Sequence, residues 1–314
     1  MRILALLVLT LLPAFVAASE PTFETSEVFP PGVNGIAHYR IPGIVVTPKG
    51  TVLAYCEARK NNSSDWGEIE VHLRRSTDGG KTWLPSQHIA HHGERMEGNP
   101  RKAKGGEREQ TVNNPVAIVD HQTGAIEFLY CVHYARCSSM RSQDDGVKWS
   151  EPVEITASFE PFRERYDWKV IATGPGHGLR IKSGRLVVPV WLAYGNVGDQ
   201  KPSASGTICR ASIVTHASKP GTLIFSNPHS LDRDESGKER PAGRGKRKNL
   251  SIKLSYDDGT PWPINKILDA GPSADSDLAV LEKLFMQFRI DRWVFVHLKD
   301  QSFRAAGCWH ANLR

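Results

Sequence analysis

The stretch STDGGKTW at residues 76–83 recurs as SQDDGVKW at residues 142–149 and as SYDDGTPW at residues 255–262. All three share the form S-x-D-x-G-x-x-W, and each follows a short run of alternating apolar and polar residues. The pattern predicts a hairpin turn: the aspartate folds back on backbone N–H groups, the glycine adopts angles that other residues avoid, and the tryptophan anchors the loop to the sheet. A turn repeated once per supersecondary unit indicates a β-propeller.

The rest of the chain has the same β character. Runs such as IEVHLRRS (69–76), AIEFLYCVHYAR (125–136) and NLSIKLSY (249–256) alternate between apolar and polar residues and end at turn-forming residues. A helical period appears first in LAVLEKLFMQF at residues 278–288. We therefore predict an all-β fold. The three turns start at residues 76, 142 and 255, so the second interval has room for a blade without a recognisable turn. The propeller is expected to be incomplete, with exposed strand edges.

The N-terminus has the composition of an export signal. Arg2 precedes an apolar run over residues 3–16, and small residues follow up to Ala18. This pattern predicts a secretory signal at residues 1–18 and a secreted or periplasmic protein, although a buried N-terminal strand or helix is an alternative. The run is shorter than the ~20 apolar residues that a membrane helix needs, and no later stretch approaches that length, so we expect no membrane span.

The cysteines do not indicate a disulfide-stapled scaffold, because five of them leave at least one unpaired. Cys131, His133 and Cys137 have the residue types of metal ligands, but they lack a matching second half and also fit strand residues beside a turn. We predict no metal and no cofactor.

The charge balance is modestly basic, with 40 Lys and Arg against 34 Asp and Glu. Part of the excess lies at residues 232–249, where both signs occur. A solvated, flexible insertion explains this segment better than a polyanion site, which would be more purely basic. We expect no nucleic-acid partner.

Taken together, these motifs resemble those of a known family. The repeated turn resembles the Asp box of the sialidases (exo-α-neuraminidases), and YRIP at residues 39–42 resembles their Arg-Ile-Pro motif. Three further segments, 57–76, 174–191 and 247–259, occur in the order that such enzymes use. The resemblance covers about residues 27–280 and implies a six-bladed β-propeller. Together with the signal at 1–18, it divides the chain into a propeller at 19–280 and an atypical tail at 281–314. It also implies a retaining exo-α-sialidase whose partner is a sialylated glycan.

The resemblance assigns the substrate-binding residues. Three arginines bind the sialic acid carboxylate in this family, because a guanidinium fork matches a carboxylate. Arg40 matches the first and Arg247 the third, although a solvated loop arginine is the alternative for Arg247. Glu57 is expected to hold Arg40, and Arg59 is expected to line the pocket. No residue matching the second arginine is found.

The resemblance also assigns the catalytic residues. Asp65 occupies the place of the general acid/base, and His177 in GPGHG is expected to shape a tight turn facing the pocket. The family's nucleophile is a tyrosine in an A-Y-S-D-L loop, whereas this chain has ADSDL, with Asp275 at that position. A carboxylate there repels the substrate's own carboxylate by roughly 4 kcal/mol at ~4 Å and an effective dielectric of about 20. The glutamate that activates the tyrosine is also not found.

These departures leave three functions open. The chain is a sialidase-class hydrolase of doubtful competence, a propeller that binds sialic acid without cleaving it, or a structural propeller without a ligand. The sequence after Val280 lacks the final turn and strand that the family uses to close its ring, so a foreign or frameshifted tail is a further hypothesis.

Overall fold

The computed structural model describes most of the chain between residues 27 and 287. The described residues are 27–61, 64–90, 109–164, 168–174, 176–180, 186–188, 190–193, 212–215, 222–229, 231–233, 239–241, 248–256, 261–273, 276–281 and 284–287. Nearly all regular structure in these ranges is β-strand, and one 3-10 helix, η1 (Thr156–Glu164), is present. None of the helical residues in these ranges forms a segment long and apolar enough to cross a membrane.

Three four-stranded antiparallel sheets are the main units of the fold. In each, neighbouring strands follow one another along the chain, apart from the excursion between β14 and β17. The first sheet contains β1 (His38–Val46), β2 (Val52–Arg59), β3 (Ile69–Ser76) and β4 (Gln87–Ala90). The second contains β5 (Val112–Val119), β6 (Ile126–Val132), β7 (Arg136–Ser142) and β8 (Val153–Glu154). The third contains β13 (Ser212–Thr215), β14 (Leu223–Pro228), β17 (Lys248–Ser255) and β18 (Ile264–Pro272).

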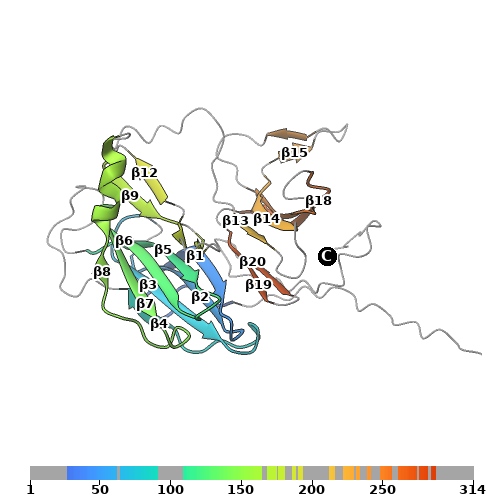
Figure 1. The fold of residues 1–314 in the computed structure, drawn as a ribbon. Helices are drawn as coiled ribbons and strands as arrows, with labels where there is room; N and C mark the ends of the chain where they lie inside the picture. The colour runs from blue at the N-terminus through green and yellow to red at the C-terminus, as the bar shows by residue number, and fades with distance from the viewer. Residues whose placement is uncertain are drawn as a thin grey trace, which may run out of the picture.

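The remaining strands form two-stranded pieces. They are β9 (Val170–Thr173) with β12 (Val190–Ala193), β10 (Leu179–Arg180) with β11 (Leu186–Val187), β15 (Leu231–Arg233) with β16 (Glu239–Pro241), and β19 (Leu278–Leu281) with β20 (Leu284–Gln287). Figure 1 shows the first two sheets and the β9–β12 pair on one side, and the third sheet with β19 and β20 on the other. The described strands form separate blade-like sheets that do not close a ring, which confirms the prediction of an incomplete all-β propeller.

The helical conformation that the sequence pattern indicated for residues 278–288 is wrong, because this stretch contains the strands β19 and β20. Leu278 and Ala279 are buried, and they pack into the clusters around the third and the first sheet, respectively. Tertiary burial on both faces favours an extended strand over the local helical pattern. The pair also straddles the boundary that we placed between residues 280 and 281.

The repeated turns have the predicted chemistry. In the first copy the Ser76 hydroxyl donates to Asp78 at 2.7 Å and accepts from the Gly80 N–H at 2.8 Å, and Asp78 also accepts from the Thr82 N–H at 2.9 Å. Asp78 also accepts a hydrogen bond from the Thr82 hydroxyl. This bond first, and then those from the Thr82 N–H and the Ser76 hydroxyl, lower the pKa of Asp78 to about 2. The second copy has the equivalent three backbone and side-chain bonds, at 2.9 to 3.0 Å, among Ser142, Asp144, Gly146 and Lys148.

The tryptophans of the turns anchor them to the sheets, as predicted. Trp149 packs on the largest buried cluster, where its ring meets the edge of Phe128 with centroids 5.3 Å apart. Trp83 packs on the cluster beneath β1 and β2. In the third copy, Trp262 lies 5.8 Å from the ring of Phe225, while residues 257–260 of that turn lie outside the described residues.

The core between the first and second sheets is centred on Tyr55. Its ring packs edge-on against Phe128 at 5.1 Å, and its hydroxyl donates to the Gly176 carbonyl and accepts from the Ala117 N–H. Burial, followed by the nearby charge of Asp277, raises the pKa of Tyr55 well above its usual value. The phenol is therefore a neutral structural link between β2, β5 and the 174–178 turn.

Candidate active site

A β-bulge follows Arg40 near the start of β1. The strand register passes from the Arg40–Glu57 pair directly to the Gly43–Tyr55 pair, and Ile41 in the bulge has a φ of 54°. A Cβ atom on Gly43 would lie 2.1 Å from the Tyr55 ring, so only glycine leaves room for that ring. The bulge interrupts pairing just after Arg40, a position from which a side chain can be re-aimed away from the sheet.

Glu57 and Arg59 form a buried ion pair on β2. They are two residues apart and so lie on the same face of the strand. Nε and Nη2 of Arg59 donate to Oε2 of Glu57 at 3.0 and 2.5 Å, and the Asn114 N–H of β5 donates to Oε1 at 2.9 Å. The side chains are 0% and 1% exposed. Burial lowers the pKa of Arg59, but the charges of Glu57 and Asp65 outweigh burial and raise it overall.

This arrangement corrects the partner that we expected for Glu57. We expected its carboxylate to hold Arg40, whereas it binds Arg59 and the backbone of Asn114. Arg40 and Glu57 are instead register partners across the β1–β2 pair. Directly opposite residues on adjacent strands project to the same face, so the register alone allows an Arg40–Glu57 contact. The bulge that follows Arg40 re-aims its side chain, whose guanidinium contacts Asp65.

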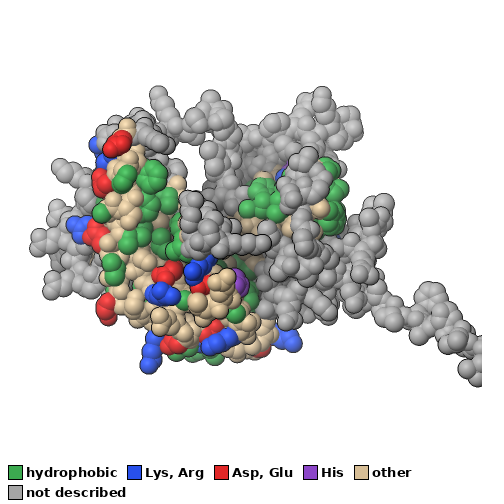
Figure 2. All heavy atoms as spheres, viewed as in Figure 1, with side chains coloured by type: hydrophobic (Ala, Val, Ile, Leu, Met, Phe, Trp, Pro, Cys, Tyr) green, Lys and Arg blue, Asp and Glu red, His purple; other side chains and the backbone are tan. Residues whose placement is uncertain are grey.

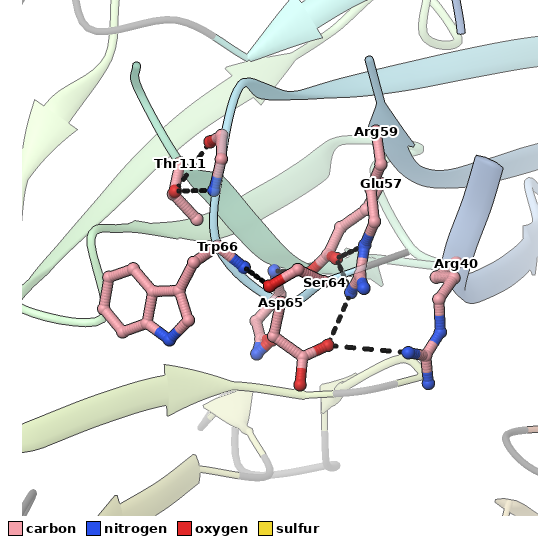
Figure 3. A network of polar contacts seen from close by, with 9 residues as sticks. Arg40, Glu57, Arg59, Ser64, Asp65, Trp66 and Thr111 are labelled. Atoms are coloured by element: carbon pink, nitrogen blue, oxygen red, sulfur yellow. Dashed lines mark hydrogen bonds and ion pairs between the residues drawn. The ribbon is translucent and has the colours of Figure 1, made fainter. Parts of the chain in front are cut away.

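Asp65 joins the two arginines on the solvent side. Its Oδ1 atom lies 2.9 Å from Nη2 of Arg59 and 3.6 Å from Nη1 of Arg40, and 58% of its side chain is exposed (Figure 3). The structure therefore brings together Arg40, Glu57, Arg59 and Asp65, four of the seven residues assigned from the sequence. A single carboxylate oxygen contacts both guanidinium groups, and the side chain remains open to solvent.

The loop that carries Asp65 is held in place by hydrogen bonds and by one aromatic contact. The Trp66 N–H donates to the Ser64 hydroxyl at 3.2 Å, and Gly67 exchanges two hydrogen bonds with the Thr111 hydroxyl, at 3.2 and 2.8 Å (Figure 3). The Trp66 ring lies 4.9 Å from the ring of Tyr134, which belongs to the β6–β7 hairpin. Thr111 and Tyr134 thus connect the loop to the second sheet.

His177 follows two glycines in left-handed backbone conformations and has a buried partner, while Pro175 of the expected tight turn lies outside the described residues. Gly174 and Gly176 have φ angles of 74° and 82°, and His177 forms a parallel bridge with Ala117. The His177 Nδ1 atom lies 2.9 Å from Oδ1 of Asp277. Burial lowers the pKa of His177, but the charge of Asp277 and the hydrogen bond to it outweigh burial and raise it overall.

Asp277 is the residue that sequence reasoning missed. It is fully buried, and its carboxylate accepts hydrogen bonds from the Ile44 N–H and the Ser212 hydroxyl, both at 2.8 Å. It therefore ties β1, β13 and the His177 turn together. The available signal was a second aspartate in ADSDL, two residues after the one we singled out.

The other two assigned residues, Arg247 and Asp275, lie outside the described residues.

On the face shown in Figure 2, basic and acidic side chains of the described part lie close to one another.

Comparison with known proteins places this geometry in a family. Residues 50–208 match the family model of the BNR repeat-like domain. A sialidase of Bacteroides fragilis (strain YCH46) is 32% identical over 179 residues, which cover 50% of this chain and 31% of that protein. An exo-alpha-sialidase of Arthroderma benhamiae is 27% identical over 231 residues, covering 68% of this chain and 53% of the relative. This chain belongs to the sialidase family with BNR repeats.

The solved structures agree on the fold. The Hadza microbial sialidase Hz136 superimposes with a TM-score of 0.63 at 21% identity, over 88% of this sialidase-family chain and 68% of that chain. The β-propeller of the sialidase type is therefore the fold of this protein. The chain spans only about a third to a half of the length of the curated relatives named above.

Proposed function

We propose that this chain is a sialidase-class glycoside hydrolase in origin, with a site for the terminal sialic acid of a glycoconjugate. The observation that carries the proposal is the contact of the exposed Asp65 carboxylate with both Arg40 and Arg59. An exposed carboxyl group on a loop is able to approach a glycosidic oxygen and to transfer a proton to it. The guanidinium of Arg40 is able to exchange its contact with Asp65 for one with the carboxylate of a sialic acid.

The role of the buried pair is to keep this arrangement in place. Glu57 is fully buried and fixes the Arg59 guanidinium through two hydrogen bonds. Arg59 in turn contacts the loop carboxylate at 2.9 Å. Positioning through a chain of bonded groups is what a proton-transfer residue on a loop requires.

We further propose that the sequence as it stands has little or no turnover. Asp275 occupies the position of the family's nucleophilic tyrosine, and neither the activating glutamate nor the second carboxylate-binding arginine is found in the sequence. Asp65 alone assists departure of the leaving group and supplies no nucleophile. Binding of sialic acid without hydrolysis is the second candidate function, because Arg40 is retained and positioned.

The experiment is a paired assay on the purified full chain. Turnover of a fluorogenic α-sialoside and binding of sialyllactose, by titration calorimetry, are measured for the unmodified chain, Arg40→Gln and Arg141→Gln. Arg141 is the matched control, since it forms a surface ion pair with Glu127 on the second sheet. We expect binding without turnover, and loss of binding in Arg40→Gln but not in Arg141→Gln.

The other outcomes are equally informative. Turnover that disappears in Asp65→Asn establishes an active hydrolase and contradicts the assignment of Asp275 as an inactivating change. Absence of both binding and turnover in a folded chain contradicts the site itself and leaves a structural propeller.

Export is a separate part of the proposal and rests on residues 1–18, which lie outside the described residues. The charged start, apolar run and small residues before Ser19 support removal of the first 18 residues during secretion. Intact mass of the protein recovered from an expressing host tests it, because a mature chain beginning at Ser19 is expected.

A further inference from the structure

Two cysteines lie opposite each other on the β6–β7 hairpin, one strand pair away from its turn. We call this position, where Cys131 faces Cys137, the neck of the hairpin. Cys131 on β6 and Cys137 on β7 are register partners, and both side chains are fully buried. The third described cysteine, Cys56, pairs in register with His72 on β3. All three are free thiols in the structure.

The backbone shows which kind of strand pair the two cysteines form. The Cys137 N–H donates to the Thr156 hydroxyl at 2.9 Å, and its carbonyl accepts from the Ile155 N–H at 2.8 Å. Both groups therefore point away from β6, so Cys131 and Cys137 form a non-hydrogen-bonded pair. In such pairs the Cα atoms are about 4.5 Å apart and the side chains approach most closely. This Cα–Cα distance lies within the range that a disulfide requires.

The environment of the pair favours attack by Cys131. Its sulfur accepts a hydrogen bond from the Thr173 N–H at 3.4 Å. Burial raises the pKa of Cys131, but hydrogen bonds from Cys137 and Thr173 outweigh burial and lower it overall. The same hydrogen bond to Cys131, together with burial, raises the pKa of Cys137. A thiol of lowered pKa is the one that starts a thiol–disulfide exchange.

The hairpin between the cysteines is strained and reaches the candidate active site. His133 and Tyr134 have φ angles of 51° and 52°, the left-handed region that non-glycine residues rarely adopt. The Ala135 N–H donates to the Val132 carbonyl and closes the turn. Tyr134 contacts Trp66, the neighbour of Asp65. A covalent link across the neck therefore constrains the turn that supports the Asp65 loop.

We propose that Cys131 and Cys137 form a cross-strand disulfide, made by exchange with a low-molecular-weight disulfide such as oxidised glutathione. The Cys131 thiolate attacks one glutathione sulfur and releases a glutathione thiolate, which takes up a proton. The Cys137 thiol then loses its proton and attacks the Cys131 sulfur, releasing the second glutathione. The balance is two protein thiols and one glutathione disulfide giving one protein disulfide and two glutathione thiols.

Both thiols are buried in the finished fold. The exchange therefore takes place as the chain folds, while the strands around Cys131 assemble and glutathione still reaches it, and the test uses refolding. The full chain is unfolded in urea with reductant and refolded at a series of ratios of reduced to oxidised glutathione. A parallel sample stays in urea at the same ratios. Remaining thiols are alkylated in denaturant, and tryptic peptides are mapped by mass spectrometry. Trypsin cleaves after Arg136, so the two cysteines leave in separate peptides unless a disulfide joins them.

In urea, linking Cys131 to Cys137 costs the entropy of closing the 131–137 loop, whereas in the folded chain the hairpin has already closed that loop. We therefore expect the equilibrium constant for forming the link to be about 50-fold larger in the refolded chain than in urea. Cys56 is expected to be alkylated in both samples. Equal constants in the two samples, alkylation of both cysteines at the most oxidising ratio, or a link from Cys131 to Cys56 would each overturn the proposal.

Two variants keep the result independent of folding failure. Cys56→Ser is expected to retain the 131–137 link, and Cys137→Ser to lose it. The urea midpoint of the unmodified chain is expected to fall on reduction, whereas that of Cys137→Ser is expected to be insensitive to the glutathione ratio. A midpoint that falls equally on reduction in both chains contradicts the assignment, and circular dichroism verifies that each chain is folded. This result does not depend on sialic acid binding, so its failure leaves the proposed function in place.

Discussion

Replacing Glu57 with glutamine tests whether the buried ion pair holds the candidate active site together. The substitution keeps the size of the side chain and leaves an amide oxygen able to accept from the Asn114 N–H. It removes the charge that two nitrogens of Arg59 contact at 3.0 and 2.5 Å. Arg59 then remains as a buried cation that is 1% exposed.

The expected loss of stability follows from these contacts. Removing one partner of a buried ion pair costs about 3 to 5 kcal/mol, because the other charge stays desolvated. Arg59 retains its contact with Asp65 at 2.9 Å, but that carboxylate is 58% exposed and compensates by at most about 1 kcal/mol. We therefore expect Glu57→Gln to lower the free energy of unfolding by about 3 kcal/mol.

The assay is equilibrium unfolding in urea, followed by tryptophan fluorescence. Glu127→Gln is the matched control, since Glu127 lies 3.3 Å from Arg141 in a surface pair whose side chains are 26% and 46% exposed. It is expected to cost less than about 1 kcal/mol. Arg59→Gln and the double variant with Glu57→Gln complete a cycle, in which the double variant loses less than the sum of the single losses. Equal costs for Glu57→Gln and Glu127→Gln, or strict additivity in the cycle, would refute the reasoning.

Three further predictions concern other parts of the chain. The pKa of His177 is raised in the folded state, so its ion pair with Asp277 stabilises the fold. This stabilisation is fully present below the unfolded-state pKa of about 6.5 and is lost as the pH rises through the folded-state pKa. The stability advantage of the unmodified chain over His177→Gln should shrink from pH 5 to pH 8 in urea titrations, and a growing advantage contradicts the pairing. Gly146→Ala should lower the thermal midpoint more than Gly124→Ala: both glycines have φ near 78°, but only at Gly146 does an added Cβ lie 2.5 Å from Leu53. Equal shifts would show that Leu53 moves aside without cost. Asp275→Tyr should recover little turnover of a fluorogenic sialoside, because a phenol of pKa near 10 needs an activating base that the sequence lacks, and a large gain would show that such a base exists.

The turn motif was predictable from the sequence because its bonds are local. Each hydrogen bond among Ser76, Asp78, Gly80 and Thr82 joins residues no more than four positions apart, so the residue types and their spacing specify these bonds. The alternating runs likewise specify strands, since a period of two places one face on the core. The helical pattern at residues 278–288 failed for the opposite reason, because packing against distant sheets decided its conformation.

Which side chains pair with one another was decided only by the tertiary structure. The sequence by itself determined the blade-like β fold, the family, and the gathering of Arg40, Glu57, Arg59 and Asp65, because these residues lie on paired strands and the loop that follows them. It did not determine that Glu57 binds Arg59, that Asp277 binds His177 from 100 residues away, or that Cys131 faces Cys137 in a non-hydrogen-bonded pair. Each of these depends on strand register and burial, which bring groups together at ångström precision and remove the water that would otherwise compete for them.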